Sequence, residues 1–150
     1  MRMRACIIIM QGSDRVPCPG GSYCSSTGLS SVNGLPVCSA GQYCPITSSS
    51  PVPCPLGAYC PYPGMSAALT CPAGTFCGST GHSVPSPCPI GSFCPNNAMS
   101  APTLCTAGSY CSTTGLQSVS GSCSAGYFCP QGSVFASSGA TFGQGTNMNL

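Results

Sequence analysis

A seven-residue motif with a cysteine at each end occurs seven times in this chain and constrains its fold more than any other feature. The motif is C-x-x-G-x-[YF]-C, and its copies read CPGGSYC (18–24), CSAGQYC (38–44), CPLGAYC (54–60), CPAGTFC (71–77), CPIGSFC (88–94), CTAGSYC (105–111) and CSAGYFC (123–129). The first cysteines of successive copies lie 16 to 20 residues apart. A unit of about 17 residues cannot fold alone, so we expect neighbouring repeats to share contacts.

The motifs hold 14 of the 15 cysteines in the chain. Leu, Ile, Val and Phe together make up only 24 of the 150 residues, too few to bury a sizeable core against chain entropy. A cysteine content of 10% is typical of a secreted disulfide scaffold, so we expect disulfides to replace the core. The cysteines expected to form them are Cys18, Cys24, Cys38, Cys44, Cys54, Cys60, Cys71, Cys77, Cys88, Cys94, Cys105, Cys111, Cys123 and Cys129.

Two pairing schemes are compatible with this spacing, and the sequence alone does not decide between them. In the first scheme each motif closes on itself, as in Cys71–Cys77, and Cys6 is left over. In the second scheme each motif is joined to the next, as in Cys77–Cys88, and Cys6 pairs with the first motif. The constant five-residue interior favours the first scheme, because the gaps between motifs vary from 9 to 13 residues.

The charged side chains argue against several classes of function. All four of them (Arg2, Arg4, Asp14 and Arg15) lie in the first fifteen residues. Three arginines at one end cannot follow a phosphate backbone, so we expect no nucleic-acid partner. With no Glu or Lys and a single His, the chain lacks the groups for general acid–base chemistry, and we expect neither an enzyme nor catalytic residues.

Metal and redox sites are also not expected. Structural zinc sites use cysteine pairs separated by two to four residues, whereas here five residues intervene. Redox catalysis uses C-x-x-C beside a group that lowers a thiol pKa, and no such group is evident. His82 stands where other repeats carry Leu or Met, so we interpret it as an ordinary repeat position. We therefore predict no metal and no cofactor.

The motif predicts turns and very short strands. Proline after the first cysteine is expected at the second position of a β-turn, and the glycine at the turn end or at a positive φ. Spacers often carry another glycine four residues past the second cysteine, as at Gly64, Gly81 and Gly115. Gly, Pro and Ser interrupt every helical period. We predict small disulfide-rich, irregular or β-turn tandem repeats in an elongated rod or solenoid-like array, with strands of two to four residues and almost no helix.

The repeats divide the chain into three parts. Residues 1–17 are interpreted as a leader or a truncated N-terminal segment, residues 18–131 as the repeats, and residues 132–150 as a flexible Gly/Ser-rich tail. No apolar run approaches the roughly 20 residues of a membrane span. The spacers are rich in Ser, Thr and Pro, a composition typical of O-glycosylated segments. The candidate acceptors are Thr47, Ser48, Ser49, Ser50, Ser83, Ser86, Thr113 and Thr114.

The stretch CPAGTFCGSTGHSVPSPCPIGSFC (71–94) resembles the ephrin-receptor-like cysteine-rich repeats of extracellular proteins, and the resemblance covers about residues 18–131. It rests on C-P-x-G-x-[YF] and the Ser/Thr-rich spacers. The chain departs from that family because a cysteine directly follows every aromatic residue and the usual cysteine about three residues before the next unit is missing. Disulfide pairing therefore cannot be transferred from the family. The resemblance implies a surface, matrix or flagellar-hair protein and no catalytic residues.

These observations predict an extracellular or cell-surface structural protein that self-associates into a filament, flagellar hair or matrix and carries O-glycans. Its low charge removes repulsion between copies. The alternative is a stalk or ectodomain fragment of a receptor or adhesin that acts as a binding module.

Overall fold

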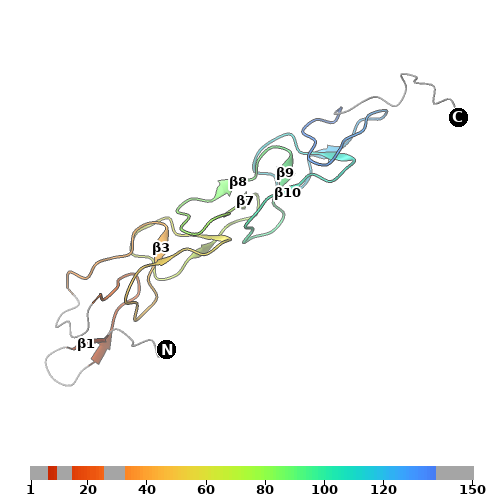
Figure 1. The fold of residues 1–150 in the computed structure, drawn as a ribbon. Coiled ribbons are helices and arrows are strands. Elements are labelled where there is room, and N and C mark those ends of the chain that lie inside the picture. Colours follow the sequence, from red (N-terminus) through yellow and green to blue (C-terminus); the bar gives the residue numbers. More distant parts are fainter. Residues whose placement is uncertain (1–6, 10–14, 26–32, 138–150) are drawn as a thin grey trace. The chain divides into compact units, whose positions relative to one another are not determined.

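The computed structural model describes residues 7–9, 15–25 and 33–137, and within them it contains strands, turns and no helix (Figure 1). The chain forms two compact units. The first comprises Met1–Cys71 and Cys77–Pro85, and the second comprises Pro72–Phe76 and Ser86–Leu150. The small disulfide-rich tandem-repeat fold that the sequence predicts is thus confirmed.

Strands come in antiparallel pairs, each confined to one unit. In most repeats the residues just before the second cysteine pair with the residues just before the next first cysteine. The first unit contains β1 (Ile7–Ile9) with β2 (Arg15–Pro17), β3 (Gln42–Tyr43) with β4 (Val52–Pro53), and β5 (Ala58–Tyr59) with β6 (Leu69–Thr70). The second contains β7 (Thr75–Phe76) with β8 (Ser86–Pro87), β9 (Ser92–Phe93) with β10 (Thr103–Leu104), and β11 (Ser109–Tyr110) with β12 (Gly121–Ser122).

Every motif contains a β-turn, but the turn begins at the residue after the first cysteine, one position later than expected. In the fourth motif the Thr75 N–H donates to the Pro72 carbonyl at 3.1 Å, which makes Pro72 the first residue of the turn. The prediction of proline at the second position is therefore wrong. Gly74 is the third residue, with φ of 84°, as in a type II turn, which requires a positive φ there. Proline fits the first position because its missing N–H is not needed there.

Consecutive repeats that lie within one unit are joined by four backbone hydrogen bonds. The glycine and second cysteine of one motif donate to the next repeat, and the first cysteine and glycine carbonyls accept from it. Between the second and third repeats these bonds are Gly41 N–H to Cys60 (2.8 Å), Cys44 N–H to Met65 (2.8 Å), Gly64 N–H to Cys38 (2.7 Å) and Cys54 N–H to Gly41 (2.9 Å). In the second unit they are Gly91 N–H to Cys111 (3.0 Å), Cys94 N–H to Leu116 (2.8 Å), Gly115 N–H to Cys88 (2.8 Å) and Cys105 N–H to Gly91 (2.9 Å).

The segment after each of the second to seventh motifs contains a further residue with positive φ, three or four residues past the second cysteine, which we call the spacer-turn residue. These residues are Thr47, Gly64, Gly81, Ala98, Gly115 and Gly132. In four motifs the glycine lies against the spacer-turn carbonyl two repeats further on, in the same unit; these glycines are Gly21, Gly41, Gly74 and Gly91. A Cβ built on Gly74 would lie 2.6 Å from the Gly115 oxygen, and one on Gly91 would lie 2.7 Å from the Gly132 oxygen. Contacts therefore reach the next repeat and the one after it.

The start of the expected tail belongs to the repeats. Gly132 N–H donates to the Cys105 carbonyl at 2.9 Å, and Ser124 N–H donates to the Ala136 carbonyl at 2.8 Å. Ser133 is also buried, with 7% of its surface exposed. Residues 132–136 thus complete the seventh repeat. Of the expected tail, residues 138–150 lie outside the described residues, as do most of residues 1–14.

Candidate functional site

The fourteen motif cysteines form seven disulfides, and each one closes a motif on itself. The first unit holds Cys18–Cys24, Cys38–Cys44, Cys54–Cys60 and Cys71–Cys77, and the second holds Cys88–Cys94, Cys105–Cys111 and Cys123–Cys129. Their Cα–Cα distances lie between 6.0 and 6.3 Å, inside the usual range for a disulfide. The turn produces this distance because it folds the five intervening residues back on themselves. Cys6 lies outside the described residues.

Cysteine also forms the core. Among the described residues, the only buried hydrophobic side chains are thirteen of these cysteines, each at most 1% exposed. Larger apolar side chains such as Ile46, Tyr62 and Val84 are 68–69% exposed. The motif aromatic residues before Phe128 are half-buried. The interior of each repeat is therefore a disulfide surrounded by backbone.

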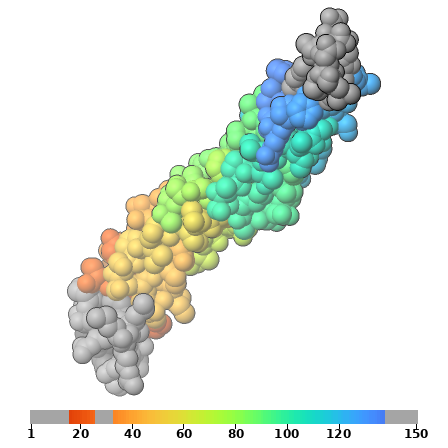
Figure 2. Space-filling model, turned by 45° about the vertical axis from the view of Figure 1, so that its right-hand side comes forward, coloured from red at the N-terminus to blue at the C-terminus, as the bar shows by residue number. Residues whose placement is uncertain are grey.

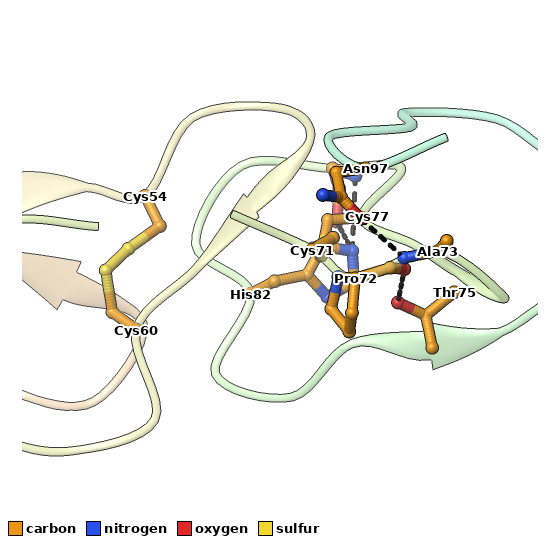
Figure 3. Close-up of a disulfide and its surroundings, with 10 residues drawn as sticks. Cys54, Cys60, Cys71, Pro72, Ala73, Thr75, Cys77, His82 and Asn97 are labelled. Carbon is orange, nitrogen blue, oxygen red and sulfur yellow. Dashed lines mark hydrogen bonds between the residues drawn. A yellow bond between two sulfur atoms is a disulfide. The ribbon is translucent and has the colours of Figure 1, made fainter. Parts of the chain in front are cut away.

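Two polar side chains, those of Asn97 and Thr75, reinforce a motif turn in the second unit. The Ala73 N–H donates to Asn97 Oδ1 at 2.9 Å, and the Thr75 hydroxyl donates to the Pro72 carbonyl at 2.7 Å (Figure 3). The same view shows the Cys54–Cys60 disulfide of the first unit. Asn97 lies 24 residues along the chain from Ala73 and so fixes a later spacer against this turn.

The single histidine has a structural role. The carbonyl of His82 accepts the Cys60 N–H at 2.8 Å, as the equivalent Met65 and Leu116 do in other repeats. Its Nε2 accepts the Ser79 N–H at 3.3 Å. Within the described ranges no three His, Cys, Asp or Glu side chains are close enough to hold a metal ion. No helix in the same ranges could cross a bilayer.

The eight candidate glycan acceptors differ in accessibility. Ser49, Ser50, Thr113 and Thr114 are exposed, whereas Thr47, Ser48, Ser83 and Ser86 are half-buried. The Ser48 hydroxyl donates to the Pro45 carbonyl at 2.7 Å, and Ser86 lies in β8. Thr47 is a spacer-turn residue with φ of 68°. Solvent accessibility therefore favours Ser49, Ser50, Thr113 and Thr114 as glycan acceptors.

Sequence reasoning missed the close approach at the motif glycine. The signal was present, because glycine occupies this position in all seven motifs, whereas the spacer-turn position accepts Thr47 and Ala98. A Cβ on Gly64 meets nothing within 4 Å, while one on Gly21 would collide with the Gly64 carbonyl. Both positions need a positive φ, but a motif glycine such as Gly21 or Gly74 also needs the missing side chain.

The fold and its core define the class of protein: a small disulfide-rich tandem-repeat protein. Its seven disulfides indicate folding in an oxidising environment. No family model matches the chain, and no curated protein is significantly similar to it.

Proposed function

We propose that this chain is an extracellular structural protein whose copies associate into a filament, flagellar hair or matrix. The observation that carries the proposal is the contact between consecutive repeats, which is made by backbone groups. Because every repeat of every copy has the same groups, one copy can offer another the contacts that hold its own repeats together. We infer no catalytic role.

The surface also supports association. Residues 16–150 carry no Asp, Glu, Lys or Arg, so copies do not repel one another. Large apolar side chains such as Ile46, Leu56 and Val84 are more than half exposed. An uncharged surface of this kind is poorly protected against association. The resemblance to ephrin-receptor-like repeats, which we propose as the family, implies an extracellular structural role as well.

Electron microscopy of the oxidised full-length chain, and of native material labelled with an antibody against it, tests the proposal. We expect fibres or sheets in which this chain is the repeating subunit. A soluble monomer that binds a defined ligand would contradict the proposal and favour the stalk or ectodomain of a receptor or adhesin.

We propose further that the secreted chain carries O-glycans on Ser49, Ser50, Thr113 and Thr114. Intact mass spectrometry should give a mass above the 14.9 kDa of the bare polypeptide. Alanine at these four positions should remove most of the excess, whereas Ser92→Ala, at a site only 3% exposed, should not change it. A bare polypeptide mass for the secreted chain refutes the glycan assignment.

A further inference from the structure

The spacer after the first motif contains an asparagine that is directly followed by a glycine, Asn33–Gly34. Both residues are exposed and form a turn, in which Gly34 has φ of 79°. Figure 2 shows orange atoms, which belong to the early repeats of the first unit, at the molecular surface. Asparagine and glycine both suit a turn, but their order here also brings a side-chain amide next to an unshielded backbone nitrogen.

The absence of a side chain on Gly34 determines how accessible that nitrogen is. The backbone nitrogen of the residue after an asparagine can attack the side-chain amide carbon, because the attack closes a five-membered ring. A Cβ on the attacking residue hinders the approach, and glycine has none. No described atom lies within 4 Å of a Cβ built on Gly34, so the space beside the nitrogen is open among the described residues.

The other two asparagines in the described part of the chain differ in this respect. Asn96 is followed by Asn97, and Asn97 is followed by Ala98, so both attacking nitrogens belong to residues with a Cβ. The side chain of Asn97 is also restrained, because its Oδ1 accepts the Ala73 N–H at 2.9 Å. Ring closure is therefore favoured at Asn33 and disfavoured at Asn96 and Asn97.

We propose that Asn33 is a modification site, at which the side-chain amide is converted spontaneously into a carboxylate. The Gly34 nitrogen forms a bond to Cγ of Asn33, the bond from Cγ to the side-chain nitrogen breaks, and ammonia leaves with the proton of the Gly34 N–H. Water then opens the cyclic imide at one of its two carbonyl carbons. Breaking the new bond to Cγ gives aspartate, and breaking the original peptide bond gives isoaspartate. No oxidant and no enzyme is needed.

The first consequence of the reaction is a negative charge. Residues 16–150 contain no Asp, Glu, Lys or Arg, so position 33 would carry the first acidic side chain in this part of the protein. The charge would lie on an exposed turn, where water solvates it, so the fold tolerates it. The inference does not depend on the proposed self-association.

The second consequence affects the first repeat. Isoaspartate makes the backbone one methylene longer between positions 33 and 34. Directly after this turn, Leu35 packs against Cys18 and Cys24, and the Pro36 carbonyl accepts the Tyr23 N–H at 3.1 Å. A longer backbone shifts both residues relative to the motif, so isoaspartate should weaken the bond between Tyr23 and Pro36.

Mass spectrometry of the oxidised full-length chain, stored at neutral pH and physiological temperature, tests the inference. Reduction and cyanogen bromide cleavage then give fragment 11–65, in which Asn33 is the only asparagine, and fragment 66–99, which contains Asn96 and Asn97. Fragment 11–65 should become about 1 Da heavier, as NH is replaced by O, and should accept methyl groups from an isoaspartate-specific carboxyl methyltransferase. Fragment 66–99 should change at least about tenfold more slowly, which corresponds to a barrier about 1.4 kcal/mol higher.

Two further comparisons make the test specific. Asn33→Gln should abolish methylation of fragment 11–65, because a glutamine must close a six-membered ring. In the stored wild-type chain the Tyr23 amide should exchange hydrogen about two- to twelvefold faster, as expected for a weakened hydrogen bond, whereas the Ser109 amide of the second unit should not change. Equal rates for the two fragments, or a fragment 11–65 that stays unmodified, overturn the assignment of Asn33. An unchanged Tyr23 rate in the isoaspartate form overturns the effect on the first repeat.

Discussion

Replacing Gly74 with alanine tests whether the motif glycine is required for the approach of a later repeat as well as for its own turn. Gly74 and Gly108 both have φ of 84°, so alanine at either site has the same conformational cost, about 1–2 kcal/mol for an L-residue in this region. The restriction of the unfolded chain offsets about 0.4–1 kcal/mol of that cost. Of these two glycines, only Gly74 faces a backbone carbonyl among the described residues, that of Gly115. The two variants therefore form a matched pair.

The difference between them follows from the distances. A Cβ on Gly74 would lie 2.6 Å from the Gly115 oxygen, whereas ordinary contact begins at 3.4 Å. The Gly115 carbonyl would have to move away from the new Cβ. Two hydrogen bonds of 2.8 Å oppose this movement, because the Gly115 N–H donates to the Cys88 carbonyl and the Leu116 carbonyl accepts from the Cys94 N–H. Overpacking of this kind costs about 1–3 kcal/mol. Gly74→Ala should therefore destabilise its turn by about that much more than Gly108→Ala does.

Native-state hydrogen exchange in dilute, oxidised protein measures this difference at the turn amides of Thr75 and Ser109, which bond to Pro72 and Thr106. Relative to wild type, the Thr75 amide in Gly74→Ala should accelerate about 5- to 150-fold more than the Ser109 amide in Gly108→Ala, as 1–3 kcal/mol implies. Equal acceleration in the two variants would refute the reasoning.

Three further predictions follow from single contacts. The double substitution Cys71→Ser with Cys77→Ser removes one disulfide and should lower the free energy of unfolding by about 2 kcal/mol, the value for a loop this short. The loss is measured as reduced hydrogen-exchange protection of the backbone amides at positions 71 and 57. Undiminished protection would contradict a stabilising role for this disulfide. Ala98 has a φ of 61°, which is unfavourable for alanine and not for glycine, so Ala98→Gly should raise the thermal midpoint of unfolding. Ala107→Gly, at a position where φ is not positive, should lower it. A shift of the midpoint in the same direction in both variants would exclude backbone strain at Ala98. Asn97→Ala removes the acceptor of the Ala73 N–H and should speed exchange of that amide about two- to twelvefold, while Asn97→Asp keeps an acceptor and should not.

Several features of the fold could be predicted because they depend on local chemistry. The constant interior of the motif and the shortage of large apolar residues predicted a disulfide scaffold of short strands, and this is what the structure contains. The turn frame was predicted wrongly, because a Cys-Pro dipeptide restricts the backbone without showing which four residues the turn includes. The Thr75 N–H to Pro72 bond supplies that information.

Features that depend on stacking could not be predicted. The contact between Gly74 and Gly115 joins residues 41 positions apart, and nothing in the spacing shows that a repeat touches the next but one. The pairing of the cysteines was ambiguous for a similar reason, because the number of residues between cysteines is compatible with both disulfide schemes. Only the three-dimensional turn brings Cys71 and Cys77 to a Cα–Cα distance of 6.3 Å.

The central claim, that each motif is closed by its own disulfide, can be tested by cyanogen bromide cleavage of the unreduced chain. The reagent cuts after methionine, and Met65 and Met99 lie between second and first cysteines of successive motifs. Disulfides within motifs predict that fragments 11–65, 66–99 and 100–148 separate without reduction, and mass spectrometry would find each one alone. Fragments that stay joined until a reductant is added, through Cys60–Cys71 and Cys94–Cys105, would contradict the account.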